Sequence, residues 1–411
     1  MDDLYGQEIA KWQALEDSAR CFFEAYGFRE IRTPILESTE LFQRSIGEAT
    51  DIVHKEMYTF QDRGERSLTL RPEMTASVVR AALEHHLLQK DEPLFLYYLG
   101  PMFRAERPQA GRKRQFYQIG VETLNAHSAV NDAELIIMIA DFLKHLGLKT
   151  FTVKLNHLGS ADDRAKYSEE LSRYFKKNQG KLCPDCQYRL QRNVLRIFDC
   201  KNESCQPSIR EAPKQALSGE AKSNFDEILA LIKEAGVSYQ LEPRLVRGID
   251  YYTGFVFEVT GTGLGAQDAI LAGGRYDSLI HELGGERMGA SGFSIGVERL
   301  LAALGVAKVS LEHEILADTV YVAAIAHGKE SCAFYRRVAQ GLFGARKRAH
   351  FSFSEASITN HMSRANKMNA GFALIIGPDE WKAGEVSLKN MKTGAQKRMK
   401  PEALQEGFKT V

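Results

Sequence analysis

The sequence predicts an α+β protein in which an antiparallel sheet carries the main domain and a smaller α/β domain follows it. Two apolar segments, residues 94–99 and 115–121, flank a charged loop and indicate an antiparallel hairpin. Residues 161–235 are more polar and hold four closely spaced cysteines, which indicates an inserted helical domain. Strand, basic helix and strand then succeed one another in residues 319–376, the order of a small α/β domain.

These patterns also predict the domain boundaries. We expect a main domain of residues 1–160 and 236–310, an inserted domain of residues 161–235, and a C-terminal domain of residues 319–411. Pro72 suits the first position of a helix within residues 68–90. Apolar patterns predict helices over 8–26, over 132–148 and from about residue 297, an extended segment over 28–36 and a strand over 256–260. Residues 310–318 are expected to be a linker. Beyond them, we expect strands over 319–325 and 372–376 on either side of a helix over 330–347.

Composition limits the class of protein. The 411 residues include 54 Lys and Arg against 53 Asp and Glu, a net charge of +1, so an RNA partner would require local clusters of basic residues. No apolar run approaches the roughly 18 residues of a membrane span. The N-terminus is acidic and lacks an apolar signal core. We therefore expect a cytoplasmic protein with no membrane partner.

The charged loop of the hairpin is the first candidate for chemistry. Arg104 stands at its base, and four further Lys and Arg residues follow before Gln115. A guanidinium holds anionic oxygens in a bidentate geometry, as phosphoryl or adenylyl transfer requires. By itself, such a charge run is more often a solvated turn.

A second candidate lies at residues 290–301, where a Gly-rich strand leads into a helix that carries Arg299. Small residues allow a ligand to approach the backbone closely. The alternative is a buried strand–helix packing site with Glu298 and Arg299 at the surface. Each of the two candidates is moderate evidence when it is taken alone.

Together, and in this order, these stretches resemble the motifs of class II aminoacyl-tRNA synthetases. Residues 28–36, with Pro34, resemble motif 1. Residues 103–116 (Phe-Arg-Ala-Glu-Arg-Pro-Gln-Ala-Gly-Arg-Lys-Arg-Gln-Phe) resemble motif 2, and residues 292–301 (Gly-Phe-Ser-Ile-Gly-Val-Glu-Arg-Leu-Leu) resemble motif 3. Residues 245–254 (Leu-Val-Arg-Gly-Ile-Asp-Tyr-Tyr-Thr-Gly) and 272–277 (Ala-Gly-Gly-Arg-Tyr-Asp) resemble the two signatures of histidyl-tRNA synthetases. The resemblance spans nearly the whole chain and implies the class II synthetase fold.

The resemblance implies a role for each matching residue. The positions that match the amino-acid site are Glu73 and Thr75 for the substrate amino group, Gln118 and Glu122 along its wall, and Tyr251, Tyr252 and Tyr276 at the imidazole pocket. The positions that match the ATP site are Arg104, which bridges carboxylate and α-phosphate, Arg247 at the α-phosphate, Arg299 on ATP, and Arg112 in the motif 2 loop.

The implied reaction consumes ATP with Mg²⁺, forms histidyl-adenylate and pyrophosphate, and then transfers histidine to the 3′ end of tRNA(His). Negative charge spreads over the α-phosphate oxygens in the transition state, and fixed cations stabilise it without reorganising. A site built to hydrogen-bond the imidazole leaves buried groups unpaired when the ring is missing, which gives selectivity. The resemblance also implies a homodimer.

The cysteine cluster has the spacing of a structural zinc site. Two residues separate Cys183 from Cys186, four separate Cys200 from Cys205, and thirteen lie between the pairs. The second pair is wider than a usual zinc knuckle. The alternative is four ordinary thiols, and the resemblance favours it because zinc is not a general requirement of this family.

The C-terminal domain has the local basic charge that an RNA partner would need. Residues 331–354 include five basic and no acidic residues, and residues 382–400 include six basic residues and Glu385. A solvated helix face is the alternative, but the position resembles the anticodon-binding domain of the family.

Two other functions are alternatives to aminoacyl-tRNA synthesis. Histidyl-tRNA synthetase paralogues serve as the regulatory subunit of ATP phosphoribosyltransferase, and they usually lack the anticodon domain and the histidine signatures. An RNA-binding pseudo-synthetase is the second alternative. The three arginines at 104, 247 and 299, and the C-terminal domain, disfavour both. The chain departs from the family pattern at Val194, usually Pro, and at Ala105, commonly His, and Met1 falls after the family's usual Gly-Thr loop and first strand.

Overall fold

The computed structural model describes residues 3–47, 50–90, 92–106, 112–265, 268–325 and 331–411. Contacts between residues divide the chain into two compact units, which are residues 16–309 and residues 310–411. Residues 4–15 group with the second unit.

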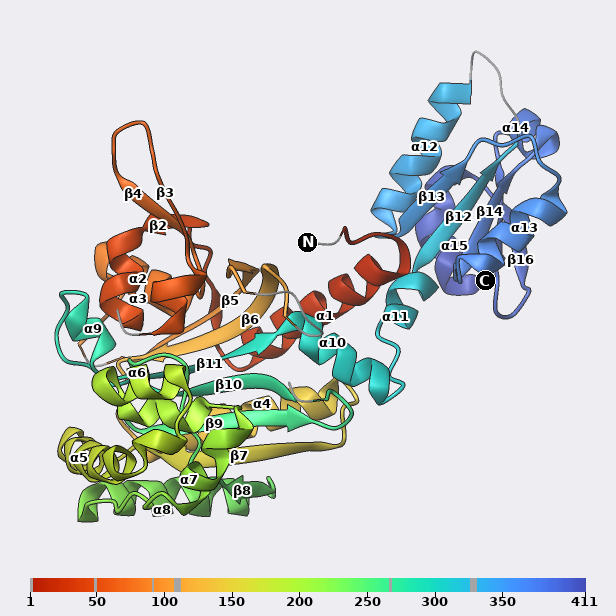
Figure 1. The fold of residues 1–411 in the computed structure, drawn as a ribbon. Coiled ribbons are helices and arrows are strands. Elements are labelled where there is room, and N and C mark those ends of the chain that lie inside the picture. Colours follow the sequence, from red (N-terminus) through yellow and green to blue (C-terminus); the bar gives the residue numbers. More distant parts are fainter. Residues whose placement is uncertain (1–2, 48–49, 91, 107–111, 266–267, 326–330) are drawn as a thin grey trace. The chain divides into compact units, whose positions relative to one another are not determined.

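A large sheet forms the centre of the first unit (Figure 1). Its described strands are, in spatial order, β1 (Arg29–Glu30), β5 (Leu94–Phe103), β6 (Gln115–Leu124), β11 (Ala290–Gly296), β10 (Ala269–Arg275), β9 (Phe255–Gly261), β7 (Phe151–His157) and β8 (Tyr239–Leu241). The pairs from β5 to β7 are antiparallel, and the two short edge strands pair in parallel with their neighbours. The predicted antiparallel hairpin and the α+β fold class are confirmed.

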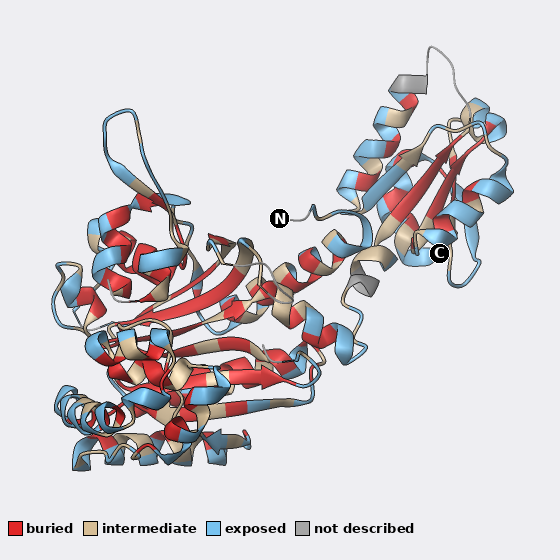
Figure 2. Ribbon diagram, in the orientation of Figure 1, coloured by how far each residue is buried: buried red, intermediate tan, exposed pale blue. Residues whose placement is uncertain are grey.

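The central strands are buried on both faces (Figure 2). The burial of β9 is nearly continuous, and its run Phe-Val-Phe-Glu-Val is apolar except for Glu258. Such a strand needs layers on both sides of the sheet. Helices that pack around it include α1 (Gly6–Ala25), α3 (Thr75–Glu84), α4 (Ala129–His145), α8 (Gly219–Glu234), α9 (Leu279–Glu282) and α10 (Val297–Val306).

A small three-stranded sheet lies next to α2 (Thr39–Ile46) and α3, with the strand order β2 (Leu36–Ser38), β4 (Ser67–Leu70) and β3 (Tyr58–Gln61). A single π-helical turn, η1 (Ile52–Glu56), follows α2. Buried Leu41, Phe42, Ile46 and Ile52 pack against Ala76 of α3. This packing holds the start of α3 in place beside the large sheet.

Residues 161–235 are helical, as predicted for the inserted stretch. The elements are α5 (Ala161–Lys177), η2 (Gln179–Lys181), α6 (Pro184–Arg192), η3 (Val194–Asp199), η4 (Glu203–Cys205), α7 (Gln206–Glu211) and α8. The segments from α5 to α7 share a core built on Leu171, Phe175 and Ile197, whereas α8 packs against α4. We name the segments from α5 to α7 the inserted module.

The second unit is an α/β structure on a five-stranded sheet, with the strand order β13 (Arg348–Ser352), β12 (Thr319–Ala324), β14 (Phe372–Ile376), β15 (Val386–Asn390) and β16 (Gln396–Met399). The first two pairs are parallel and the last two antiparallel. Its helical segments are α11 (Glu312–Ala317), α12 (Ser331–Gly344), α13 (Ile358–Lys367), α14 (Pro378–Ala383), η5 (Pro401–Ala403) and α15 (Leu404–Thr410). The predicted α/β character of this region is confirmed.

Two local predictions are wrong. Pro72 is not the first helical residue, because α3 begins at Thr75 and the Glu73 carboxylate accepts hydrogen bonds from the first N–H groups of the helix. Residues 310–318 are not a plain linker, because α11 forms within them and its Leu316 carbonyl accepts a hydrogen bond from Gly371 N–H. The first error comes from a local side-chain contact that replaces the expected proline at the helix start, and the second from a backbone hydrogen bond to a residue distant in the sequence. No helix in the described residues has the length and apolar character to cross a membrane.

Candidate active site

A pocket opens beside strands β6, β10 and β11 and encloses about 1180 Å³ of empty space, its mouth included. The structure brings every non-cysteine residue of the predicted site to its wall: Glu73, Thr75, Arg104, Arg112, Gln118, Glu122, Arg247, Tyr251, Tyr252, Tyr276 and Arg299. These residues span more than 220 positions, from 73 to 299, and come from several strands, helices and loops. One part of the pocket is rich in carboxyl and phenol groups, and the other is rich in guanidinium groups.

The carboxyl–phenol end is centred on Glu73 and Glu122, which are both almost fully buried. The Glu73 carboxylate accepts hydrogen bonds from the N–H groups of Thr75 at 2.8 Å and Ala76 at 3.0 Å, so the first turn of α3 orients it. Glu122 projects from β6 and accepts from the Thr75 hydroxyl at 2.7 Å and from the Tyr276 hydroxyl. These hydrogen bonds hold both carboxyl groups in fixed positions within the protein.

Glycine makes room for Glu122 on the neighbouring strand. Gly292 of β11 pairs directly with Glu122 of β6. A Cβ atom at residue 292 would lie 2.1 Å from Glu122 Oε2 and 2.4 Å from the Val121 carbonyl oxygen. Gly120 similarly admits the Tyr98 phenol, whose oxygen would lie 2.3 Å from a Cβ there. These two positions explain why small residues occur along the motif 3 strand and its partner.

Three tyrosine rings form the apolar wall of this end. The Tyr251 ring centroid lies 4.9 Å from that of Tyr252 and 5.4 Å from that of Tyr276. Burial raises the pKa of Tyr252 to about 12 and the pKa of Tyr276 well above its usual range. The phenols therefore stay protonated at neutral pH and act as hydrogen-bond donors.

Burial also raises the pKa values of both carboxyl groups. The pKa of Glu73 rises because the group is buried, although its N–H donors oppose the rise. The pKa of Glu122 rises to about 8, first because of burial and further because of the charge of Glu73, against the hydrogen bonds from Tyr276 and Thr75. A cationic ligand group at this end would offset the cost of two buried carboxylates.

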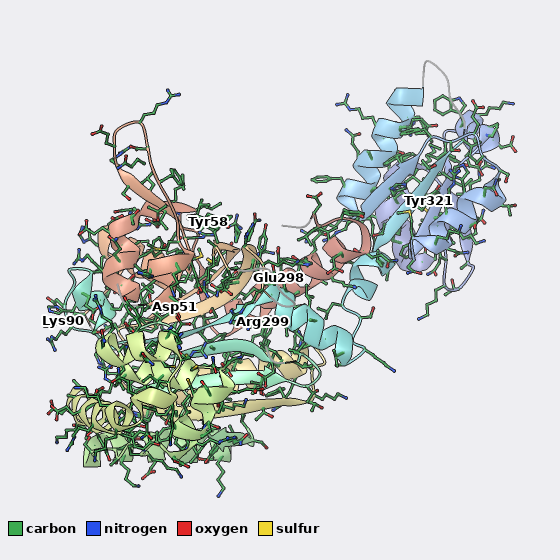
Figure 3. The ribbon with its side chains drawn as sticks, viewed as in Figure 1. Asp51, Tyr58, Lys90, Glu298, Arg299 and Tyr321 are labelled. Atoms are coloured by element: carbon green, nitrogen blue, oxygen red, sulfur yellow. The ribbon has the colours of Figure 1, made fainter. Side chains whose placement is uncertain are left out.

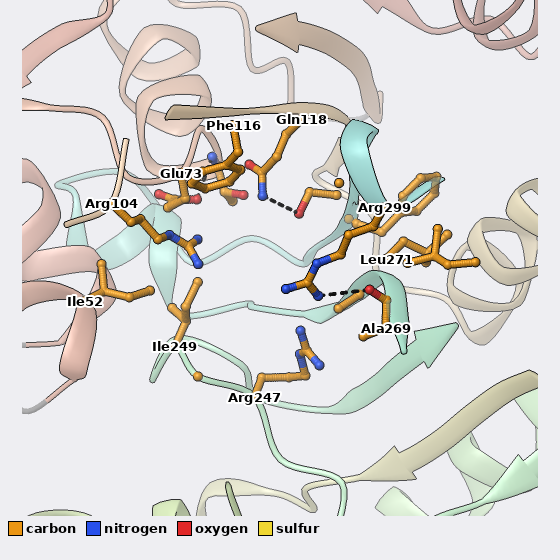
Figure 4. Close-up of a pocket in the computed structure, with 18 of the residues that line it drawn as sticks. Ile52, Glu73, Arg104, Phe116, Gln118, Arg247, Ile249, Ala269, Leu271 and Arg299 are labelled. Atoms are coloured by element: carbon orange, nitrogen blue, oxygen red, sulfur yellow. Dashed lines mark hydrogen bonds between the residues drawn. The ribbon is translucent and has the colours of Figure 1, made fainter. Parts of the chain in front are cut away.

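Three arginines converge at the other end of the pocket, as Figure 4 shows for Arg104, Arg247 and Arg299. Arg104 follows β5 and donates from Nε to the Pro72 carbonyl at 2.9 Å, which leaves its terminal nitrogens directed into the pocket. Arg299 is on the first turn of α10 and donates from Nη1 to the Ala269 carbonyl at 2.9 Å. Arg247 pairs with Glu258 of β9 at 2.7 Å.

The cations influence one another. The pKa of Arg299 is lowered, first by burial and then by the charges of Arg112 and Arg104. Concentrated positive charge in a half-buried site is unfavourable without an anion, so the arrangement favours a polyanionic ligand. Arg112 forms an ion pair with Glu106 at 2.9 Å, and residues 107–111 of the motif 2 stretch lie outside the described residues.

Gln118 lies between the two ends. Its amide nitrogen donates to the Ser294 hydroxyl at 3.2 Å (Figure 4). Its Oε1 atom is buried and has no hydrogen-bond partner among the described residues. An unpaired buried acceptor in a pocket wall indicates that a ligand donor completes the site.

Several residues at the site were not predicted from the sequence. Tyr98 and Phe116 line the pocket, and the Arg104 guanidinium lies 5.1 Å from the centroid of the Phe116 ring. Glu258 was also missed, although an acidic residue in an otherwise apolar strand is a signal that could have found it. A buried pair, Arg275 with Asp132 at 2.6 Å, fixes the end of β10 next to Tyr276.

The four predicted metal ligands lie away from this pocket, in the inserted module. The Sγ atoms of Cys183, Cys186, Cys200 and Cys205 all lie within 4.8 Å of one another. None of the five cysteines whose side chains are described forms a disulfide.

Comparisons with known proteins agree with this geometry. The chain matches the family model described as histidyl-tRNA synthetase over residues 1–300 and the anticodon binding domain model over residues 319–410. A histidine–tRNA ligase of Halothermothrix orenii is 46% identical over 400 residues, covering 96% of this chain and 94% of the relative. One of Moorella thermoacetica is 44% identical, covering 97% and 94%.

Solved structures give the same result. The apo structure of S. aureus histidyl-tRNA synthetase superposes with a TM-score of 0.76 at 32% identity, and the match covers 100% of this chain and 98% of that one. This agreement confirms the class II synthetase fold that the sequence motifs predicted. Because the family model covers most of the chain and its relatives align over nearly their full length, the chain belongs to the histidyl-tRNA synthetase family.

Proposed function

We propose that this chain is a histidine–tRNA ligase, which activates histidine with ATP and esterifies it onto tRNA(His). One observation carries the proposal, which is that buried carboxylates with phenol partners and three convergent arginines face the same pocket. The carboxylates and phenols suit an amino acid with a cationic amino group and a polar ring, and the arginines suit a nucleoside triphosphate. Relatives that carry the name histidine–tRNA ligase support the same function.

The carboxyl–phenol end would bind histidine. Glu73, held by the N–H groups at the start of α3, would accept from the substrate ammonium group, with Thr75 beside it. Glu122 and Tyr276 would meet the imidazole, because they are the hydrogen-bonding pair deepest in the pocket. An amino acid without ring N–H groups would leave these buried groups unpaired, which gives discrimination of several kcal/mol in comparable sites, on the order of 10⁴-fold or more.

The arginine end would carry out the adenylation step. An oxygen of the histidine carboxylate forms a bond to the α-phosphorus of ATP, and the bond to the bridging oxygen of pyrophosphate breaks, so pyrophosphate leaves with the electron pair. Arg104 and Arg247 would hold the charge that develops on the α-phosphate, and Arg299 would hold the rest of the triphosphate with Arg112. Because their backbone and carboxylate contacts already orient these side chains, little reorganisation is needed in the transition state.

The arginine end also suits Mg²⁺. Glu106 and Glu298 line it, and Mg²⁺ is commonly held by one or two carboxylates together with substrate phosphates. When bound there, the ion would neutralise charge on the leaving pyrophosphate. Both Glu298 oxygens accept from Tyr117 N–H, at 3.2 and 3.3 Å, so β6 holds this carboxylate at the pocket wall.

Transfer to tRNA would follow in the same pocket. A terminal ribose hydroxyl attacks the carbonyl carbon of the adenylate, an ester bond forms, and AMP leaves. The C-terminal unit would bind the anticodon, since its match to an anticodon binding domain and its exposed Arg336 and Arg346 suit RNA phosphates. The regulatory-subunit alternative is not favoured, because both this domain and the pocket arginines are present.

A homodimer in the cytoplasm completes the proposal. Ile35 and Leu36, within the stretch that resembles motif 1, are each 42% exposed at the start of β2, an edge strand of the three-stranded sheet. Exposed apolar side chains at such an edge suit a contact with a second copy of the chain. Sedimentation of the purified protein would test this part, and a monomer at micromolar concentration would contradict it.

Histidine-dependent exchange of pyrophosphate into ATP tests the proposed activity. We expect exchange with histidine and not with the other amino acids, and near-complete loss in Arg247→Ala, because the charge on the α-phosphate loses its fixed partner. Arg210→Ala is the matched control, since Arg210 is exposed on α7 outside the pocket. A well-folded protein that exchanges with no amino acid in the presence of Mg²⁺ would contradict the proposal and favour the regulatory-subunit function.

A further inference from the structure

The four cysteines of the inserted module have the arrangement of a tetrahedral metal site. A tetrahedron with Zn–S bonds of about 2.3 Å has sulfur atoms about 3.8 Å apart. The Sγ atoms of Cys183 and Cys200 are 3.8 Å apart, and all four Sγ atoms lie within 4.8 Å of one another. Cys186 and Cys205 are fully buried, whereas Cys183 and Cys200 are half-buried. Four thiols converge here on a centre that one ion can fill.

The backbone around the cluster donates to sulfur. Cys183 N–H points to Cys205 Sγ at 3.2 Å, and Asn202 N–H points to Cys200 Sγ at 3.4 Å. Such donors stabilise thiolates, which are the form that binds zinc. They arise from tight local turns: Cys183 precedes the Pro184 that begins α6, and Cys200 directly follows η3.

The cysteines lie in the part of the inserted module that has the shortest elements. Between residues 178 and 211 it is made of short 3₁₀ segments and helices of nine residues or fewer. Cys186 and Cys205 belong to its core, next to Leu182, Leu190 and Ile209. Small, loop-rich regions with a limited apolar core are commonly stabilised by a structural metal.

We propose that Cys183, Cys186, Cys200 and Cys205 bind one structural Zn²⁺ ion, and that this ion fixes the inserted module against the loops of the active site. All four ligand positions are filled by protein, so the ion has no open position for substrate and serves structure rather than catalysis.

The contacts between the module and the active site lie directly beside the cysteines. Arg189, three residues after Cys186 on α6, forms an ion pair with Asp51 at 2.9 Å. Asp51, labelled in Figure 3, immediately precedes Ile52, which lines the pocket. Arg196 of η3 also contacts Asp51, at 3.5 Å.

A second contact reaches the first histidine signature. Asn193 donates from Nδ2 to Asp250 Oδ1 at 2.9 Å, and Asp250 immediately precedes Tyr251 of the pocket. Asn193 lies between α6, which begins next to Cys183, and η3, which ends just before Cys200. The ion would therefore fix both ends of residues 183–200, the segment that contacts Asp51 and Asp250 next to the pocket. This coupling, unlike the metal site itself, rests on the proposed function.

Metal analysis of the purified full-length protein tests the site without any activity measurement. We expect one zinc per chain when the protein is prepared without chelators, and protection of four thiols from alkylation until the metal is removed. The double variant Cys186→Ser/Cys205→Ser should lose the zinc, whereas Cys21→Ser should keep it, because Cys21 is exposed and far from the cluster in sequence.

Cobalt provides a second readout if the double variant fails to fold. The wild-type protein, stripped and refilled with Co²⁺, should show the intense visible absorption of a four-thiolate tetrahedral site. Protein from zinc-replete preparations that holds no zinc, or that carries a Cys183–Cys200 disulfide in its place, would overturn the proposal. Retention of zinc by the folded double variant would overturn it equally.

The coupling has its own test. Zinc-depleted protein that keeps its far-ultraviolet circular dichroism should show a KM for histidine raised several-fold in pyrophosphate exchange, reversed by added Zn²⁺. Asp51→Asn should raise KM in the same way while the zinc stays bound. An unchanged KM in both would refute the coupling, whereas absence of exchange in the zinc-loaded protein would refute the proposed function and leave the metal site standing.

Discussion

The two ends of the pocket differ in how deeply their side chains are buried and in the contacts that hold them. At the carboxyl–phenol end, Glu73, Glu122 and Tyr276 are almost fully buried and bonded to one another or to the start of α3. At the arginine end, Arg104, Arg247 and Arg299 are half-buried, and contacts to the Pro72 carbonyl, to Glu258 and to the Ala269 carbonyl orient them along the pocket wall.

This difference separates recognition from chemistry. A ligand that leaves a buried polar group without a hydrogen bond binds less tightly, so we expect the carboxyl–phenol end to select the amino acid. Cations held in fixed orientations lower the free energy of a transition state in which negative charge develops, so we expect the arginine end to accelerate the reaction. The two ends share Gln118, whose Oε1 has no hydrogen-bond partner in the described part of the chain and could accept from a ligand donor.

The largest effect should come from the arginine end. Arg104→Ala should lower kcat/KM for exchange by roughly 10²–10³-fold, mostly in kcat, as expected for loss of a fixed donor to a transition-state oxyanion. Arg104→Lys keeps the charge but loses the bidentate geometry and should recover only part of the rate. Steady-state exchange kinetics would measure both. Full recovery by lysine would indicate that charge alone matters.

The carboxyl–phenol end should respond mainly in KM. Glu122→Gln should raise the KM for histidine by about 10–100-fold with a smaller change in kcat, because the amide replaces one of the two oxygens that accept from Thr75 and Tyr276 with an NH₂ donor. Glu134→Gln, on the exposed face of α4, is the control. If kcat fell as much as in the arginine variants, the proposed separation between the two ends would be wrong.

The buried carboxyl group should also make stability depend on pH. The pKa of Glu122 in the folded protein is about 8, above its unfolded value of roughly 4.3, so the folded state keeps a proton that the unfolded state has lost. Its contribution to stability is therefore present at low pH and declines as pH rises from about 4.3 to 8.

Glu122→Gln removes this titration. Its free energy of unfolding, relative to the wild type, should increase by more than about 1 kcal/mol between pH 5 and pH 8. Urea denaturation without ligands at both pH values would measure the difference. A constant difference between the two proteins would show that Glu122 titrates normally in the folded state.

The smallest effect should come from Phe116, which supports the Arg104 guanidinium with its ring. Phe116→Leu should lower kcat/KM by roughly two- to five-fold, the value of a partly exposed cation–π contact of about 0.5–1 kcal/mol. Phe60→Leu on β3, where the ring is 45% exposed, serves as the control. A loss as large as that of Arg104→Ala would mean that the ring contacts the substrate directly.

The sequence by itself determined much of this protein. Short apolar runs placed β5, β6, β9, β12 and β14 within a few residues, because strands that are buried on both faces carry apolar side chains at most positions. The ordered motifs named the family and predicted eleven residues that the structure brings to one pocket. Those residue types are dictated by local chemistry, since phosphates need guanidinium groups and an ammonium needs a carboxylate.

Only the tertiary structure decided which groups meet. No local pattern pairs Arg247 with Glu258, Arg275 with Asp132, or Asp51 with Arg189, because each pair joins segments that are set together by packing. The start of α3 was also decided by the folded chain, because the helix begins at Thr75 and the Glu73 carboxylate accepts hydrogen bonds from its first N–H groups. The cysteine spacing indicated either a metal site or four ordinary thiols. The fold of the inserted module brings the four sulfur atoms together. A metal site requires its ligand atoms at fixed positions in space, which spacing along the sequence does not determine.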